Sequence, residues 1–158
     1  MVNKGDRVPV ANFYKEEDGW SIPFSSESLF LGNRVLFFAV SGAFTRICSD
    51  NHLPGYISSS KEIKSKGIDC IVCLSTNDAL VLGAWARHYA VEDITMVSDG
   101  NGEFTRLMGL EVDETQYGMG FRSQRYAMII NDGKVEYIAI DKPGEVLVSS
   151  AEEMIKKL

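Results

Sequence analysis

VLFFAVSGAFTRICSDNHLPGY, residues 35–56, is typical of a buried strand that runs through a short turn into a helix. The first six residues are all apolar and uncharged, which predicts a buried strand. Ser41 and Gly42 end this run, and the polar residues after them favour a helix. Cys48 is therefore expected in the first helical turn. Free N–H groups and the positive end of the helix dipole favour a thiolate there. The sequence thus predicts a reactive cysteine.

Thr45 stands three residues before Cys48, at the start of the same expected turn. Its hydroxyl would lie close enough to hydrogen-bond the Cys48 sulfur, or a molecule bound to that sulfur. The spacing of the two residues therefore makes Thr45 a candidate site residue beside the thiolate.

The composition limits the classes of protein to which this chain can belong. The chain has 158 residues, 45% hydrophobic and 24% charged, which fits a single soluble α/β domain over residues 1–158. The net charge of -6 argues against nucleic acid as a partner, since phosphate binding requires a basic face. No run approaches the roughly 18 apolar residues of a membrane span. The first ten residues lack a signal-segment pattern, so we expect a cytoplasmic protein, unless an organellar targeting peptide has been removed.

The three cysteines are Cys48, Cys70 and Cys73. An odd number in a reducing compartment is typical of free thiols rather than of a disulfide framework. Cys70 and Cys73 have the C-x-x-C spacing, but they stand in an expected buried strand, where residues three apart point to opposite faces. No second C-x-x-C is present, and His52 and His88 stand alone. The sequence therefore indicates no metal site.

The remaining elements follow from periodicity and turn signals. Asp18-Gly19 predicts a hairpin, Pro54 should kink the helix after Cys48, and Gly67 should end that helix. The expected elements are a hairpin over 8–22, a short helix over 25–30, strands over 35–40, 68–74 and 94–97, helices over 48–66, from Asn77-Asp78 to 89 and over 103–108, paired strands over 126–130 and 134–140, and a closing helix over 150–158.

This order, β-α-β-α-β followed by β-β-α, implies parallel crossovers in the first part and a terminal hairpin and helix in the second. It is the thioredoxin-like arrangement. We therefore expect an α/β fold with a central mixed sheet flanked by helices and an N-terminal hairpin.

Several blocks resemble the peroxiredoxins of the Prx5 type (type II), in the redoxin superfamily. Residues 38–49, FAVSGAFTRICS, are similar to the active-site loop of that family, whose pattern is Pro-x-x-x-Thr-x-x-Cys. The blocks that follow it also match, in the expected order and over nearly the whole chain: 52–56 (HLPGY), 75–78 (STND) with Trp85, 99–105 (DGNGEFT) and 122–128 (RSQRYAM).

The resemblance assigns roles to particular residues. It makes Cys48 the peroxidatic cysteine, Thr45 its hydroxyl partner and Arg125 the catalytic arginine. The thiolate would attack a peroxide and become a sulfenic acid, while Arg125 stabilises the charges. The residues around these three, in the peroxide loop and beyond it, would be Ser41, Gly42, Phe44 and Arg122.

The same resemblance implies a thiol-dependent peroxidase for hydrogen peroxide and alkyl hydroperoxides. No metal, flavin or haem cofactor is expected. No cysteine follows Cys73, so an external thiol such as glutathione, glutaredoxin or thioredoxin should recycle Cys48. A homodimer that packs through the active-site side is also implied.

Cys73 keeps two interpretations. It is a buried strand residue, or it is a resolving thiol that attacks the Cys48 sulfenic acid after local unfolding.

The chain departs from the family pattern at Ser41, where the family has proline, and at Arg46, often a second proline. Both changes put peroxidase efficiency in doubt. The alternative function is therefore a redox-sensing or interaction protein of the same fold with reduced turnover. On this view, serine in place of the family's proline weakens the active site, and Ser41→Pro should speed the oxidation of Cys48.

Overall fold

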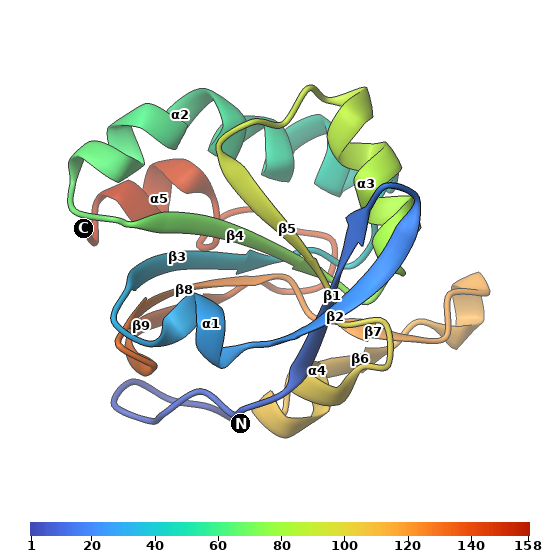
Figure 1. The fold of residues 1–158 in the computed structure, drawn as a ribbon, viewed down its shortest axis with the longest axis horizontal. Coiled ribbons are helices and arrows are strands. Elements are labelled where there is room, and N and C mark those ends of the chain that lie inside the picture. The colour runs from blue at the N-terminus through green and yellow to red at the C-terminus, as the bar shows by residue number, and fades with distance from the viewer.

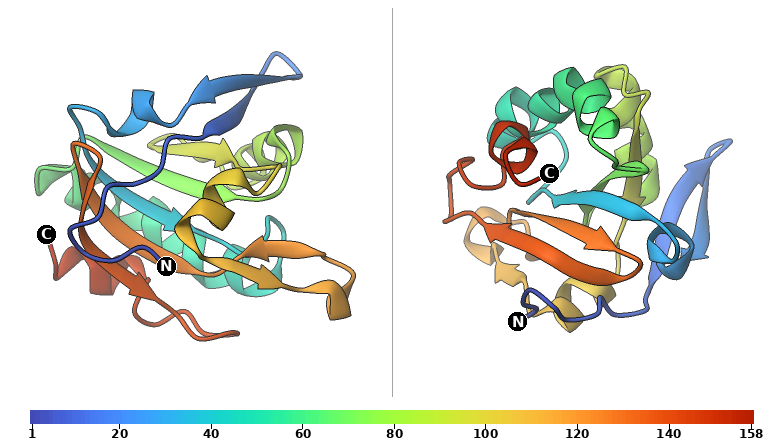
Figure 2. Two further views of the ribbon diagram at one scale, coloured as in Figure 1. Left: turned by 90° about the horizontal axis from the view of Figure 1, so that it is seen from below. Right: turned by 90° about the vertical axis from the view of Figure 1, so that its left-hand side faces the viewer.

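A seven-stranded mixed sheet forms the centre of the protein, with helices on both faces (Figures 1 and 2). The computed structural model describes residues 1–158. The strand order is β2-β1-β5-β4-β3-β8-β9. The strands of this sheet are β1 (Asn12–Glu17), β2 (Trp20–Ser25), β3 (Arg34–Ala39), β4 (Cys70–Ser75), β5 (Ile94–Ser98), β8 (Tyr126–Asn131) and β9 (Lys134–Ile140). This is the expected thioredoxin-like arrangement with an N-terminal hairpin.

Strand β3 lies near the middle of the sheet, parallel to β4 and antiparallel to β8. Its side chains alternate between two separate cores. Leu36 and Phe38 pack on one face with α2 (Leu53–Ser65), α3 (Ala79–His88) and α5 (Ala151–Ile155). Val35 and Phe37 pack on the other with α1 (Glu27–Phe30) and α4 (Glu103–Met108). The apolar run is continuous because both faces of β3 are covered.

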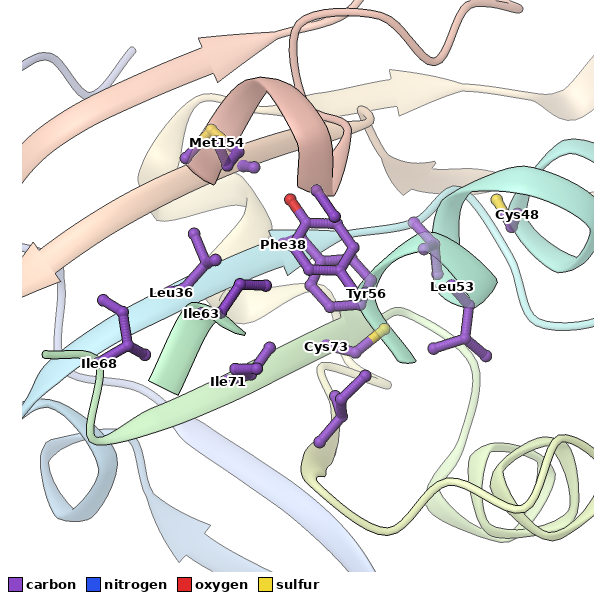
Figure 3. Close-up of a cluster of buried hydrophobic side chains, with 14 of the residues drawn as sticks. Leu36, Phe38, Cys48, Leu53, Tyr56, Ile63, Ile68, Ile71, Cys73 and Met154 are labelled. Carbon is purple, nitrogen blue, oxygen red and sulfur yellow. The ribbon is translucent and has the colours of Figure 1, made fainter. Parts of the chain in front are cut away.

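Tyr56 packs flat on Phe38 in the first of these cores, with ring centroids 3.8 Å apart and an interplanar angle of 3° (Figure 3). Both side chains are fully buried, and the Tyr56 hydroxyl donates to the Ser149 carbonyl oxygen at 2.6 Å. Helix α2 is thereby fixed to the sheet beneath it and to the chain that precedes α5.

The helix after Cys48 differs from the expected kinked α-helix. Its first turn is a π-helix, η1 (Cys48–His52), closed by a bond from the Leu53 N–H to the Cys48 carbonyl oxygen. Helix α2 then begins at Leu53, with Pro54 in its first turn. Pro54 has no N–H for the Asp50 carbonyl, so the widened turn takes the place of a regular i to i−4 bond. Pro54 therefore lies at the change from the π-helical turn to the α-helix.

The expected caps and turns are present with small shifts. Asp18-Gly19 turns the first hairpin, which spans 12–25 rather than 8–22, because Val8 and Val10 precede the pairing. Asp78 caps α3 by accepting from two backbone N–H groups, and Ser150 caps α5 by accepting from the Glu153 N–H. These are the side-chain caps that the sequence signals.

A small second sheet between α4 and β8 has no counterpart in the sequence expectation. It pairs β6 (Glu111–Asp113) with β7 (Phe121–Ser123), joined through the 3-10 turn η2 (Thr115–Tyr117). This hairpin leads to Arg125, the residue directly before β8. No helix of the protein combines the length and apolarity that crossing a bilayer requires.

Candidate active site

The loop between β3 and η1 is held by its own backbone and by the loop after β4. The Thr45 hydroxyl donates to the Gly42 carbonyl oxygen at 2.7 Å, and the Ala43 N–H donates to Asn77 Oδ1 at 2.7 Å. A Cβ atom at Gly42 would lie 3.0 Å from the Thr45 methyl carbon, so this close approach favours glycine. The Ser49 N–H then bonds to the Thr45 carbonyl oxygen and starts the helical turn. These contacts fix the conformation of the loop and thereby the position of Cys48.

Cys48 is fully buried at the beginning of η1, and Arg125 reaches its sulfur from 77 residues away. Arg125 Nη2 lies 3.1 Å from Cys48 Sγ, and Arg125 Nη1 donates to the Glu145 carbonyl oxygen at 2.9 Å. The arginine is itself only 8% exposed. A cation held this close in a buried site stabilises a negative sulfur much more than it would in water.

The pKa of the Cys48 thiol is lower than its ordinary value. Burial alone raises it, but the charge of Arg125 and hydrogen bonding from Thr45, Arg125 and Ser41 outweigh that effect. The Thr45 hydroxyl contributes when its proton turns from the Gly42 carbonyl to the sulfur. The expected reactive thiolate therefore has a physical basis in its surroundings.

Ser41 lies between the two charged groups. Its Oγ is 3.6 Å from Cys48 Sγ and 3.3 Å from Arg125 Nη2. The sequence expectation treated this serine as the loss of a proline and did not include either contact. Arg46, the other departure, has a 93% exposed side chain whose Nε lies 3.8 Å from Asp50 Oδ2, so it belongs to the surface.

Arg122 and Phe44 lie around the loop rather than on the sulfur. Arg122 Nε donates to the Met119 carbonyl oxygen at 2.8 Å, and its Nη1 lies beside Gly42. Phe44 is 53% exposed and has a positive φ of 61°, which is unusual for a residue other than glycine. The structure thus brings Cys48, Ser41 and Arg125 together and leaves Arg122 and Phe44 next to the loop.

Cys73 is fully buried on β4, in the same core as Cys48, while Cys70 faces the opposite core. All three thiols are free. Figure 3 shows the sulfur atoms of Cys48 and Cys73 well apart on different elements. Burial raises the pKa of the Cys73 thiol well above its usual value. A bond between Cys48 and Cys73 would therefore require local unfolding.

A cavity of about 540 Å³ has Ser41 and Arg125, two residues whose side chains contact the Cys48 sulfur, in its wall. Much of the remaining wall comes from two segments that the sequence analysis did not connect with the site. These are the β6–β7 region, through Glu114, Tyr117 and Gln124, and the loop after β9, through Asp141, Lys142, Pro143 and Gly144. The turn signal Asp141-Lys142-Pro143-Gly144 marks the loop, but nothing local indicates that it reaches Cys48.

A buried polar network anchors this loop after β9. Asp141 accepts from the N–H groups of Leu147 and Val148 and from the Ser149 hydroxyl. His52 Nε2 lies 3.2 Å from the Ser149 carbonyl oxygen and 3.0 Å from its hydroxyl. The loop so fixed presents the Glu145 carbonyl to Arg125, so the network positions the arginine.

His52 belongs to this structural network and not to the acid–base chemistry of the sulfur. Burial, together with the charge of Arg125, lowers the pKa of His52 to about 4, so the ring is neutral at pH 7. A carboxylate, Asp141, lies on the far side of Ser149, whose hydroxyl contacts both Asp141 and the His52 ring.

The site also has no cluster that could hold a metal. No three His, Cys, Asp or Glu side chains come together as a ligand set. The arrangement offers a buried thiol, a cation in contact with it, two hydroxyls beside it, and a cavity that Ser41 and Arg125 border. This is suited to attack by a thiolate on a small electrophile.

Comparison with known proteins identifies the family. Residues 3–155 match the Redoxin family model. The chain is 42% identical to Peroxiredoxin-2D of Arabidopsis thaliana, over 99% of this chain and 98% of that protein. Among solved structures it is similar to reduced Prx3 of Vibrio vulnificus in complex with H2O2, with 40% identity, a TM-score of 0.95 and coverage of 99% of both chains. It is also similar to peroxiredoxin 5 of Alvinella pompejana, with 30% identity, a TM-score of 0.86 and coverage of 99% and 97%. The chain therefore belongs to the redoxin family and, within it, to the peroxiredoxins, which are thiol-dependent peroxidases.

Proposed function

We propose that the protein reduces hydrogen peroxide and alkyl hydroperoxides with Cys48 as the peroxidatic cysteine. The Cys48 thiolate attacks the terminal oxygen of the peroxide, forms an S–O bond and breaks the O–O bond. Sulfur loses two electrons and becomes a sulfenic acid, and the leaving alkoxide or hydroxide takes a proton from solvent to give an alcohol or water. The observation that carries this proposal is the 3.1 Å contact between Arg125 Nη2 and Cys48 Sγ.

Arg125 would act both before the attack and during it. Its charge favours the thiolate before attack and then stabilises the charge that develops on the leaving oxygen. Thr45 would orient the peroxide, because its hydroxyl can turn from the Gly42 carbonyl toward the sulfur or toward a bound oxygen. The cavity of about 540 Å³ supports organic hydroperoxides as well as hydrogen peroxide, since it leaves room for an organic group beside Arg125.

Peroxide consumption with dithiothreitol as reductant tests this function. The proposal requires many turnovers per Cys48. A single oxidation event without turnover would instead support a redox sensor, the alternative that the sequence analysis left open.

We further propose that an external thiol completes the cycle. A thiol attacks the sulfenic acid to form a mixed disulfide and release water, and a second thiol then restores Cys48. Glutathione, glutaredoxin and thioredoxin are the candidates. The burial of Cys73 and the presence of three free cysteines support this route. Free cysteines also agree with a reducing compartment such as the cytoplasm.

Replacing Cys73 with serine should leave turnover with an external thiol nearly unchanged. A small loss of thermal stability is expected, since the new hydroxyl is buried without a guaranteed partner. Steady-state turnover with thioredoxin or glutathione, together with a melting curve, measures both. A collapse of turnover, with a Cys48–Cys73 disulfide in the intact mass of the wild type, would show that Cys73 is a resolving thiol.

A homodimer through the active-site side is also proposed. Three large hydrophobic side chains are exposed on segments that border the site: Phe44 in the loop before Cys48, and Tyr117 and Phe121 in the β6–β7 region. Phe44, which is 53% exposed, is the one of these side chains that lies in the loop itself. Such a grouping supports a protein interface. Sedimentation of the wild type against Phe44→Ala tests it: the wild type should sediment as a dimer and the variant should shift toward monomer, whereas a monomeric wild type would refute the dimer.

A further inference from the structure

Ser41 lies where the strand pairing of β3 ends and the loop that leads to Cys48 begins. The Val40 N–H still bonds to the Leu74 carbonyl oxygen of β4, and Ser41 follows it without a strand partner. Its Oγ is within reach of both Cys48 Sγ, at 3.6 Å, and Arg125 Nη2, at 3.3 Å, and the residue also forms part of the cavity wall. One hydroxyl therefore contacts both the sulfur of Cys48 and the guanidinium of Arg125, in a residue that also borders the cavity.

The protons available on Arg125 and Cys48 determine in which contact the Ser41 hydroxyl accepts a hydrogen bond and in which it donates one. Arg125 can only donate, so Ser41 Oγ is the acceptor in that contact. A thiolate has no proton, so the hydroxyl must be the donor in its contact with Cys48. The Ser41 hydroxyl has no other side-chain or backbone acceptor within hydrogen-bond distance. A donor that is itself polarised by a cation makes a stronger hydrogen bond to an anion.

We propose that Ser41 is a further catalytic residue, whose hydroxyl accepts from Arg125 and donates to the Cys48 thiolate, and thereby relays the charge of the arginine to the sulfur. This inference rests on the proposed function of Cys48. It reverses the expectation drawn from the family pattern. Proline at this position has no hydroxyl and could shield the sulfur but could not donate to it, so this chain replaces shielding with a hydrogen bond.

Because Ser41 also borders the cavity, the same hydroxyl can turn to an oxygen of the incoming peroxide. When sulfur attacks, negative charge moves from Cys48 to the leaving oxygen, and the donor can follow the charge. Proline would offer substrate only carbon atoms. The proposal therefore predicts an effect of Ser41 on the thiolate before peroxide is added and on the oxidation step itself.

The test compares Ser41→Ala, Ser41→Pro and Ser41→Thr with the wild type by two rates. The first is alkylation of Cys48 by iodoacetamide, on the acid side of the wild-type titration, with the Cys48→Ser background subtracted. The second is oxidation by hydrogen peroxide in stopped flow. Alanine and proline should each slow alkylation and oxidation about 10-fold or more, the effect of one hydrogen bond to a charged group. Threonine keeps the hydroxyl and should stay within about threefold of the wild type.

Ser49→Ala is the matched control, because it removes a buried hydroxyl next to Cys48 that accepts from Trp85 Nε1 at 3.1 Å instead of contacting the sulfur. Its alkylation rate should stay within about twofold of the wild type. Faster reaction in Ser41→Pro, or rates within twofold in Ser41→Ala, would overturn the proposal. If alanine prevents folding, as circular dichroism would show, the comparison of threonine with proline decides. A wild type that is alkylated rapidly but not oxidised would refute the peroxidase function, while alkylation would still test the Ser41 contact.

Discussion

Replacing Cys48 with serine should abolish peroxide reduction and leave the fold intact. Cys48 is fully buried against Arg125, and serine is close to it in size, so the packing of η1 should survive. The hydroxyl, unlike the thiol, does not ionise near pH 7, and its oxygen is a poor nucleophile toward peroxide. Peroxide consumption with excess dithiothreitol should fall below a few per cent of the wild-type rate, while the circular dichroism spectrum stays the same.

Cys70→Ser is the matched control for this change. Cys70 begins the same strand as Cys73 but faces the opposite core, away from the active site, and is only partly buried. Its replacement should leave turnover unchanged. Activity of Cys48→Ser above a few per cent would remove Cys48 from its role as the nucleophile, and loss of activity in Cys70→Ser would show that the effect is not specific to Cys48.

Replacing Arg125 with alanine should slow the oxidation of Cys48 by a factor of about 10² or more, a typical loss for one electrostatic stabiliser. The charge of Arg125 is the largest of the influences that lower the pKa of the Cys48 thiol, so its removal should raise that pKa. Reaction would then require a higher pH, because the thiolate forms only above the raised pKa. Stopped-flow oxidation across a pH series measures both the rate and the midpoint.

Arg46→Ala serves as the control for Arg125. Arg46 is two residues from Cys48 in sequence, but its side chain is in solvent beside Asp50. Its removal should change the oxidation rate little. An unchanged rate in Arg125→Ala would assign the stabilising role to another group, with Arg122 beside Gly42 as the next candidate.

The local features of the fold could be predicted because their causes are local. The apolar run of β3, the turn at Asp18-Gly19 and the caps at Asp78 and Ser150 each depend on a few adjacent residues. Cys48 and Thr45 share one turn, so their spacing was enough to place them together. Arg125 is different: only the resemblance to peroxiredoxins connected it with Cys48, since no local pattern spans 77 residues.

The parts that the sequence did not predict depend on contacts between distant segments. The π turn at Cys48–His52 follows from Pro54 and from the packing of α2, and a kink was the nearest local expectation. The β6–β7 hairpin is made of two three-residue strands, which are too short for an alternation signal. The Glu145 carbonyl that holds Arg125 is a backbone group, so no side-chain motif could indicate it.

Peroxide should oxidise the Cys48 thiolate to a sulfenic acid. Mass spectrometry of the reduced protein, after one equivalent of hydrogen peroxide in the presence of dimedone, tests this directly. A single dimedone adduct on the peptide that contains Cys48 is the predicted result, with Cys70 and Cys73 unmodified. An adduct on Cys70 or Cys73, or the absence of any adduct while peroxide is consumed, would contradict it.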